Sequence, residues 1–546
     1  MMLLVLTFVL VSCMHERVNE ADTNVFRYNE PDGIASLDPA LAGYQSAIWA
    51  TGHLYNGLVE LDSTLTIAPC LASSWQVSAD GRQYTFHLRK DVWFHADTCF
   101  EAAGIAKGTR TVNAHDVVFS LKRVYDGSTK STGAWVYRDR VTKIVAIDSS
   151  TVQITLASPF APFLAVLTMP YGYIVPHEAT TFYADDYGRH PVGTGPFQFA
   201  KWTSDVALEM QRNALYFKHD AAGKQLPYLD GVRISFLRDT KSEFLEFLHD
   251  GYDLVTSVDG AFAPSVYNVS GKLLEPYTKY QIFRAPALSV EYYGILLDTN
   301  LPAGKTSPLS RNRYLRQALN LAIDRHRIVT YVLHGRGIPT QHGMLPPSLP
   351  GYSKLVGGYG FDPDSARLLL AKAGYPNGKG LPAILLQLGH NPRTASVAEA
   401  IQEQWKDIGV KVNLRMVDFP QHLSQVRAGE LAMWRTSWIG DYPDPENFLA
   451  LFISANRSPA GPNTTHISNS KLDSLYNLAL NPRFTTSQRN EMYMQMQNEI
   501  VEQCPWIFLY HDVLIRLAQP RITGMTLDGT GRLLLETVRK QAKQTE

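Results

Sequence analysis

The stretch of sequence that decides the fold runs from residue 55 to residue 95 and reads YNGLVELDSTLTIAPCLASSWQVSADGRQYTFHLRKDVWFH. Short apolar runs in it are separated by turn residues. Between Tyr84 and Trp93 polar and apolar residues roughly alternate, which is the pattern of a half-buried strand. The stretch therefore predicts several short strands joined by tight turns.

A helix and a glycine-rich turn follow. Asn113 is a good N-cap for the segment AHDVVFSLKRVYDG, whose apolar residues recur at helical spacing. Further on, residues 190–202 read HPVGTGPFQFAKW. The turn Gly193-Thr194-Gly195 lacks the Lys-Ser/Thr pair of a phosphate-binding P-loop. We therefore expect these glycines to permit a tight crossing of two backbone segments.

The second half of the chain has an α/β pattern. Residues 288–298 predict a strand, and Ser310 is expected to open one long amphipathic helix that ends near Gly335. Between residues 383 and 417 a strand (AILLQLG), a helix (SVAEAIQEQWKDIG) and a strand (VKVNLRMV) follow one another. This order indicates two parallel strands connected by a crossover helix.

These stretches resemble one protein family. The tract 55–95 is similar to the patterns Y-x-G-L-V-x-L-D and P-x-L-A-x-S-W-x-V-S-x-D-G-x-x-Y-T-F-x-L-R-K of the peptide-binding proteins of ABC importers, the dipeptide/oligopeptide type of extracellular solute-binding protein family 5. Residues 190–202 are similar to P-V-G-T-G-P-F-x-x-x-x-W in that family, and the helix expected after Ser310 is similar to V-R-x-A-L-x-x-A-I-D-R-x-x-I. The resemblance covers nearly all of the mature chain.

The resemblance implies an α/β, two-lobed periplasmic-binding-protein-like fold of type II, in the large class with an extra subdomain in the first lobe. Two crossing strands would join the lobes. The implied first lobe comprises residues 24–287 and 506–546, with an inserted subdomain at about 66–187, and the second lobe comprises residues 288–505.

Length and charge agree with this interpretation. A chain of 546 residues is too long for one ordinary core, so at least two lobes are expected. Lys and Arg number 51, as do Asp and Glu. The balance gives no basic field for nucleic acid and no acidic tail.

The N-terminus predicts membrane anchoring. Residues 1–11 are apolar, and Leu10-Val11-Ser12-Cys13 resembles the bacterial lipoprotein box. We expect residues 1–12 to be a signal peptide, Cys13 to be lipidated, and residues 13–23 to form a tether at the periplasmic side or the cell surface. In one departure from a secretory signal, no Lys or Arg precedes the apolar run.

Three cysteines remain after Cys13: Cys70, Cys99 and Cys504. They allow at most one disulfide, in three alternative pairings. None has the C-x-x-C spacing of a zinc site, so the simplest interpretation is small buried apolar side chains.

The segment 434–448, WRTSWIGDYPDPENF, holds the candidate binding residues. By resemblance, Asp441 pairs with the α-ammonium of a peptide, and Arg435 meets its C-terminal carboxylate. The backbone of Ser437, Trp438 and Ile439 would hydrogen-bond the peptide as an added strand, with the Trp438 ring walling a side-chain pocket. The loop Gly43, Tyr44 and Gln45 matches the contribution of the first lobe.

Ordinary structural roles remain open for the same residues. Asp441 precedes Tyr-Pro and fits a turn residue that binds its own backbone. Arg435 fits a partner for a surface acid, and Trp434 and Trp438 fit ordinary core positions.

The resemblance implies a lipid-anchored, monomeric binding protein that captures peptides between two lobes and delivers them to an ABC permease. No metal or cofactor is expected, and the motifs HExxH, GxSxG, GxGxxG and Walker A are absent from the sequence. An enzyme is therefore not expected. Alternatives are the same fold binding a nickel chelate, haem, an opine or an oligosaccharide, and a peptide-sensing or chaperone-like module without transport.

Overall fold

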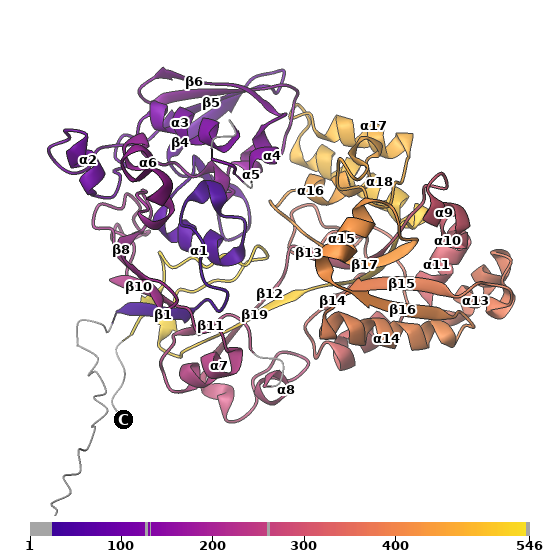
Figure 1. The fold of residues 1–546 in the computed structure, drawn as a ribbon. Coiled ribbons are helices and arrows are strands. Elements are labelled where there is room, and N and C mark those ends of the chain that lie inside the picture. The colour runs from indigo at the N-terminus through magenta and orange to yellow at the C-terminus, as the bar shows by residue number, and fades with distance from the viewer. Residues whose placement is uncertain (1–23, 126–128, 132, 259–261, 542–546) are drawn as a thin grey trace, which may run out of the picture.

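The structure is a computed structural model that describes residues 24–125, 129–131, 133–258 and 262–541. Figure 1 shows two lobes, one built from the N-terminal half of the chain and the other, in orange, from the second half. Strands β12 (Gln281–Pro286) and β19 (Val513–Ala518) run between them. The predicted two-lobed α/β class is confirmed. The expected signal peptide, Cys13 and the tether lie outside the described residues.

A mixed four-stranded sheet forms the base of the first lobe. In spatial order its strands are β1 (Val25–Asn29), β10 (Gly231–Ser235), β9 (Ala207–Arg212) and β8 (Phe197–Thr203). Only β1 and β10 run parallel. The short strand β11 (Leu254–Val255) pairs with β19, and β20 (Ile522–Thr523) pairs with β21 (Arg539–Lys540). Helices α1 (Gln45–Leu54), α7 (Thr240–Leu248) and α8 (Ala263–Val266) belong to the same lobe.

A separate antiparallel sheet stands above this base (Figure 1). Its order is β4 (Ala72–Val77), β5 (Gln83–Leu88), β7 (Thr151–Leu156) and β6 (Val141–Asp148). The hairpin β2 (Val59–Leu61) and β3 (Ile67–Pro69) precedes it. The helices near it are α2 (Thr98–Ala102), α3 (Ala114–Tyr125), α4 (Ala134–Tyr137), α5 (Phe163–Val166) and α6 (His177–Tyr183). Tract 55–95 thus forms short strands, as predicted.

The second lobe is built on one six-stranded sheet. Its order is β14 (Ile338–Pro339), β18 (Trp506–His511), β13 (Ser289–Ile295), β17 (Met433–Ile439), β15 (Ile384–Gly389) and β16 (Val412–Val417). The predicted βαβ unit is confirmed, since β15 and β16 are parallel and α14 (Pro392–Lys406) connects them. Both faces of β13 are buried, with Tyr293 in one core cluster and Tyr292 in another.

The helices of this lobe cover both faces of the sheet. They are α9 (Pro302–Thr306), α10 (Pro308–Arg311), α11 (Arg313–Leu321), α12 (Arg325–Arg327), α13 (Pro363–Lys372), α15 (Phe419–Arg427), α16 (Pro445–Leu449), α17 (Ser470–Ala479) and α18 (Thr486–Gln503). The single helix predicted from Ser310 to Gly335 is wrong. The side chains of Asn312 and Asp324 accept hydrogen bonds from Leu315 N and Arg327 N, and so start new helices inside that range.

The chain crosses between the lobes at two places in its described part. Ala287 connects β12 to β13, and Asp512 connects β18 to β19. Ala287 N donates to Asp512 O at 2.9 Å, so the crossings lie side by side. Strand β18 pairs with β13 in the second lobe, whereas we expected residues from 506 onward in the first. Hydrogen bonding to a partner some two hundred residues away decides this placement, and a local pattern does not carry that information.

The lobes also touch away from the crossings. Ala161 N, beside α5, donates to Leu480 O at the end of α17 at 2.8 Å. The loop after β7 in the first lobe therefore has a direct backbone contact with the second lobe.

The glycines of the 193–195 turn allow a close crossing, as predicted. A Cβ added at Gly193 would lie 2.1 Å from Leu54 O, and one at Gly195 would lie 2.5 Å from His53 O. Real Cβ atoms do not approach that closely, so larger side chains at either position would force the two segments apart.

The cysteines agree with the simplest interpretation. Cys70, Cys99 and Cys504 are free and buried, and none of the three candidate pairings is formed. Burial raises the pKa of the Cys504 thiol to about 11.

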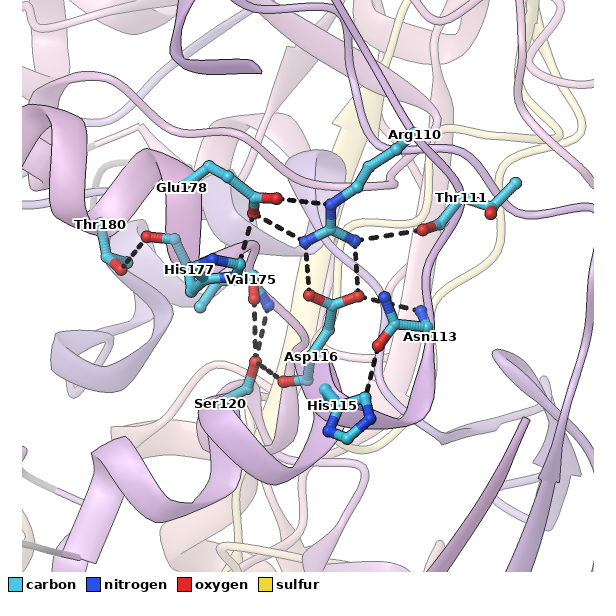
Figure 2. Close-up of polar contacts among 10 residues, drawn as sticks. All are labelled: Arg110, Thr111, Asn113, His115, Asp116, Ser120, Val175, His177, Glu178 and Thr180. Atoms are coloured by element: carbon cyan, nitrogen blue, oxygen red, sulfur yellow. Dashed lines mark hydrogen bonds and ion pairs between the residues drawn. The ribbon is translucent and has the colours of Figure 1, made fainter. Parts of the chain in front are cut away.

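An arginine joins two helices of the first lobe (Figure 2). Arg110 donates to both oxygens of Asp116 on α3, at 2.7 and 2.8 Å, and to both oxygens of Glu178 on α6, at 2.6 Å each. Asp116, His177 and Glu178 also bring three potential metal ligands within 4.8 Å of one another. The guanidinium already supplies the positive charge between the carboxylates, so we interpret this cluster as a structural ion network.

Replacing Arg110 with Met should lower the free energy of unfolding by about 3–5 kcal/mol at pH 7, because two largely buried carboxylates lose their partner. Desolvation raises the pKa of Glu178, but hydrogen bonds from Arg110 outweigh it and leave the pKa below the ordinary 4.5. A carboxyl group whose pKa is lower in the folded state than in the unfolded state stabilises the protein at pH values above the unfolded-state pKa. This contribution disappears as the pH falls through the folded-state pKa. The difference between wild type and variant should therefore shrink in acid.

Urea unfolding at pH 7 and at about pH 4 measures both effects. Arg367→Met is the control, since its partner Asp364 is 91% exposed and the change should stay below about 1 kcal/mol. Equal losses for the two variants would contradict the assigned role of Arg110.

Candidate functional site

The segment 434–448 forms the end of a central strand and the turn after it. Strand β17 contributes residues up to Ile439, and α16 begins at Pro445. Along its whole length β17 pairs with β13. It pairs with β15 only at Trp434, so beyond that residue its second edge has no strand partner in the described part of the chain.

The turn contains three acids, Asp441, Asp444 and Glu446, and the last two are bound by other side chains of the protein. Asp444 pairs with Arg489 at 2.8 Å and caps α16. Glu446 is buried and accepts hydrogen bonds from the hydroxyls of Tyr442, at 2.5 Å, and Tyr476. These contacts hold the turn in a fixed shape and take Asp444 and Glu446 out of consideration as ligand contacts.

Asp441 is different from these two acids. It is exposed, and among the described residues it has no ion pair. Its carboxylate accepts a hydrogen bond from Asn447 Nδ2 at 3.3 Å. Although the residue keeps accessible surface, the neighbouring chain removes enough water from the carboxyl group to raise its pKa, which the Asn447 hydrogen bond opposes. A carboxylate in this state favours a positively charged partner.

Asn447 organises the site, although the sequence did not single it out. Its Oδ1 accepts from Asp441 N at 3.1 Å and from the Trp438 indole Nε1 at 3.0 Å. Trp438 is half-buried and packs against the core beside α16. One buried amide thus fixes both the backbone of Asp441 and the ring of Trp438.

Arg435 already has a carboxylate partner. Its guanidinium pairs with Glu291 on β13, and the two side chains are 19% and 12% exposed. The carbonyl of Arg435 contacts His422 Nε2 at 2.8 Å. Glu291 was also not singled out from the sequence, because it lies 144 residues from Arg435 and only strand pairing brings them together.

The remaining candidates divide between the lobes. Ser437 is half-exposed, and Ile439 at the end of β17 is 71% exposed. In the first lobe Gly43, Tyr44 and Gln45 are exposed at the start of α1, with Tyr44 at 76%. No hydrogen bond or ion pair among the described residues joins this loop to residues 435–441. Figure 1 shows α1 and β17 in different lobes.

The described residues of this region contain no group of three potential metal ligands. The group of three potential metal ligands found in the described residues is the Arg110 cluster in the first lobe. No described helix is long and apolar enough to cross a membrane.

Comparisons with known proteins agree with the two-lobed fold. Residues 66–460 match the family "Bacterial extracellular solute-binding proteins, family 5 Middle". The chain is similar to heme-binding protein A of Haemophilus influenzae, with 31% identity over 536 residues that cover 94% of this chain and 92% of the relative. It is also similar to the dipeptide-binding protein of Escherichia coli, with 29% identity over 511 residues covering 89% and 88%.

Among solved structures, HbpA2 from Haemophilus parasuis is similar over 94% of this chain and 99% of that protein, with a TM-score of 0.80 and 26% identity. Proteins of family 5 are periplasmic or extracellular and bind solutes without transforming them. The family match and the 31% relative show that this chain belongs to the bacterial extracellular solute-binding proteins of family 5, and it is a binding protein rather than an enzyme.

Proposed function

We propose that this protein captures peptides between its two lobes, as a monomer, and delivers them to an ABC permease. The observation that carries the proposal is Asp441, an exposed carboxylate that has no cation partner within the described structure. The other two acids of its turn are bound by side chains of the fold. A free carboxylate in that position suits the α-ammonium group of a peptide.

The strand beside Asp441 supports a peptide as ligand. A carrier that accepts many side chains must recognise the backbone and the charged ends that all peptides share. Beyond Trp434, the edge of β17 that faces away from β13 has no strand partner in the described structure. The main chain of Ser437, Trp438 and Ile439 is therefore available to pair with an extended ligand.

Closure of the lobes would complete the site. Tyr44 of the first lobe and Ile439 of the second are large apolar side chains that are mostly exposed. A ligand that contacts both would remove this surface from water and favour the closed state. The loop Gly43, Tyr44 and Gln45 would supply the first-lobe contacts, and the side-by-side crossings at Ala287 and Asp512 would serve as the hinge.

Haem is a second candidate ligand, because the relative with 31% identity is named a heme-binding protein. The histidine ring that lies against β17 has both of its nitrogens in contact with protein atoms. His422 contacts Gln387 through Nδ1 and Arg435 O through Nε2. Asp441 and the open edge of β17 make peptide the favoured ligand, and haem is tested beside it.

Native mass spectrometry of the purified protein, followed by denaturation, should release a series of peptides if ligand stays bound through purification. A single metabolite, sugar or metal chelate would contradict peptide binding. Haem carried by the protein, or haem titration with a saturable change in the absorption spectrum, would support the second candidate instead.

Asp441→Asn should weaken peptide binding by about 10–100-fold, the range expected for losing a charge-assisted hydrogen bond. In the wild type, affinity should fall as the pH drops through the raised pKa of Asp441, because the protonated carboxyl no longer attracts an ammonium. The variant should lack this dependence. Calorimetric titration measures both, with Asp407→Asn, an exposed acid of the same lobe, as control. Unchanged affinity in Asp441→Asn would exclude the ammonium role.

We also propose that residues 1–12 are removed as a signal peptide and that lipid on Cys13 anchors the protein. In a bacterial host, the wild type should fractionate with membranes, whereas Cys13→Ser should appear in the soluble extracytoplasmic fraction. Equal distribution of both forms would contradict the anchor.

A further inference from the structure

The carboxylate of Glu291 forms an ion pair with the guanidinium of Arg435, which was expected to bind the C-terminal carboxylate of a peptide. Strand pairing sets Glu291 opposite Ser437 and Tyr293 opposite Arg435. Glu291 and Arg435 are therefore diagonal neighbours on one face of the sheet, within reach of a cross-strand ion pair. Their pairing is built into the register of β13 and β17 and does not depend on a flexible loop.

A ligand carboxylate would not easily replace Glu291 as the partner of Arg435. Glu291 is 12% exposed, and desolvation raises its pKa, which the charge of Arg435 opposes. A ligand carboxylate that took Arg435 would leave this buried group without its partner. The ligand carboxylate would also have to compete for Arg435 with the carboxylate of Glu291. Because Glu291 is held on the adjacent strand, it acts at a high effective concentration.

The surrounding charges offer no substitute for Arg435. The other charged groups that act on Glu291 are Asp512 and Arg393, and these two pair with each other at 2.7 Å. Both guanidinium groups near this face are therefore neutralised by internal carboxylates. Of the charged residues considered in the site, Asp441 has no internal partner of opposite charge. A ligand with one positive charge would neutralise it.

We propose that Glu291 takes the place at Arg435 that the carboxylate of a ligand would otherwise fill. The protein then selects ligands by a free amino end and is indifferent to a free carboxyl end. The ligand class is peptides and related amines with a free amino end, whether their carboxyl group is free, blocked, remote or absent. This inference rests on the proposed peptide function and replaces the carboxylate-binding role expected for Arg435.

The test compares alanine peptides of two to five residues in three forms: free, C-terminally amidated and N-acetylated. Calorimetric titration of the wild type should give affinities for free and amidated peptides within about threefold, and at least tenfold weaker binding of the N-acetyl form. Glu291→Gln should bind free peptides at least tenfold more tightly than amides of the same length, because Arg435 is released. The double variant Glu291→Gln/Arg435→Gln should return to similar affinities for both.

Glu209→Gln is the control, because Glu209 also forms a cross-strand ion pair, with the directly opposite and half-exposed Arg233 in the first lobe. It should leave the ratio of free to amidated peptide unchanged. Thermal unfolding of each variant verifies that it is folded. The comparison of free, amidated and acetylated peptides on the wild type does not depend on any variant.

A wild type that prefers free peptides tenfold or more over amides would overturn the inference while leaving peptide binding established. An unchanged ratio in Glu291→Gln would overturn it in the same way. If no form of any peptide binds, the peptide function itself fails and the role of Glu291 falls with it. If peptides bind but acetylation has no effect on affinity, selection by the amino end is overturned while peptide binding stands.

Discussion

The hydrogen bond from Ala287 N to Asp512 O is the constraint on which the arrangement of the two lobes depends. On one side of it β12 pairs with β19, and on the other side β13 pairs with β18. The two crossings are thus one antiparallel ribbon that enters both lobes. Regular pairing on either side resists bending, so relative motion of the lobes concentrates at the few residues between the pairs.

The candidate site is attached directly to this ribbon. Gly440 N, beside Asp441, donates to Leu288 O at 2.7 Å, one residue from the crossing at Ala287. Strand β17 also lies next to β13 over its whole length. A ligand that contacts Asp441 therefore acts on a turn bonded to the hinge segment, which gives binding a short path to lobe movement.

Much of the fold could be predicted from local sequence because it rests on local chemistry. The βαβ unit from Ile384 to Val417 and the helix after Asn113 follow from periodicity and capping. The helix after Ser310 was predicted too long, because the side chains of Asn312 and Asp324 cap new helices inside the predicted range. A capping residue can thus end one helix and start another even where the apolar spacing continues.

The candidate site was less predictable, because partners distant in sequence decide what each side chain is free to do. The pattern of the turn singled out Asp441, but only the contacts of Asp444 and Glu446 explain why those two are excluded. Asn447 and Glu291 carry no motif of their own. Their roles come from a short helix that faces back toward the strand and from the register of two strands.

The three buried thiols have a consequence for how this protein reaches its folded state. Cys70, Cys99 and Cys504 are fully enclosed and unpaired, so the described structure contains no covalent bond that an oxidising enzyme must make. Proteins of oxidising compartments commonly rely on such bonds. In the described residues, packed cores and ion pairs hold both lobes, so their folded shape does not depend on a bond between these three thiols.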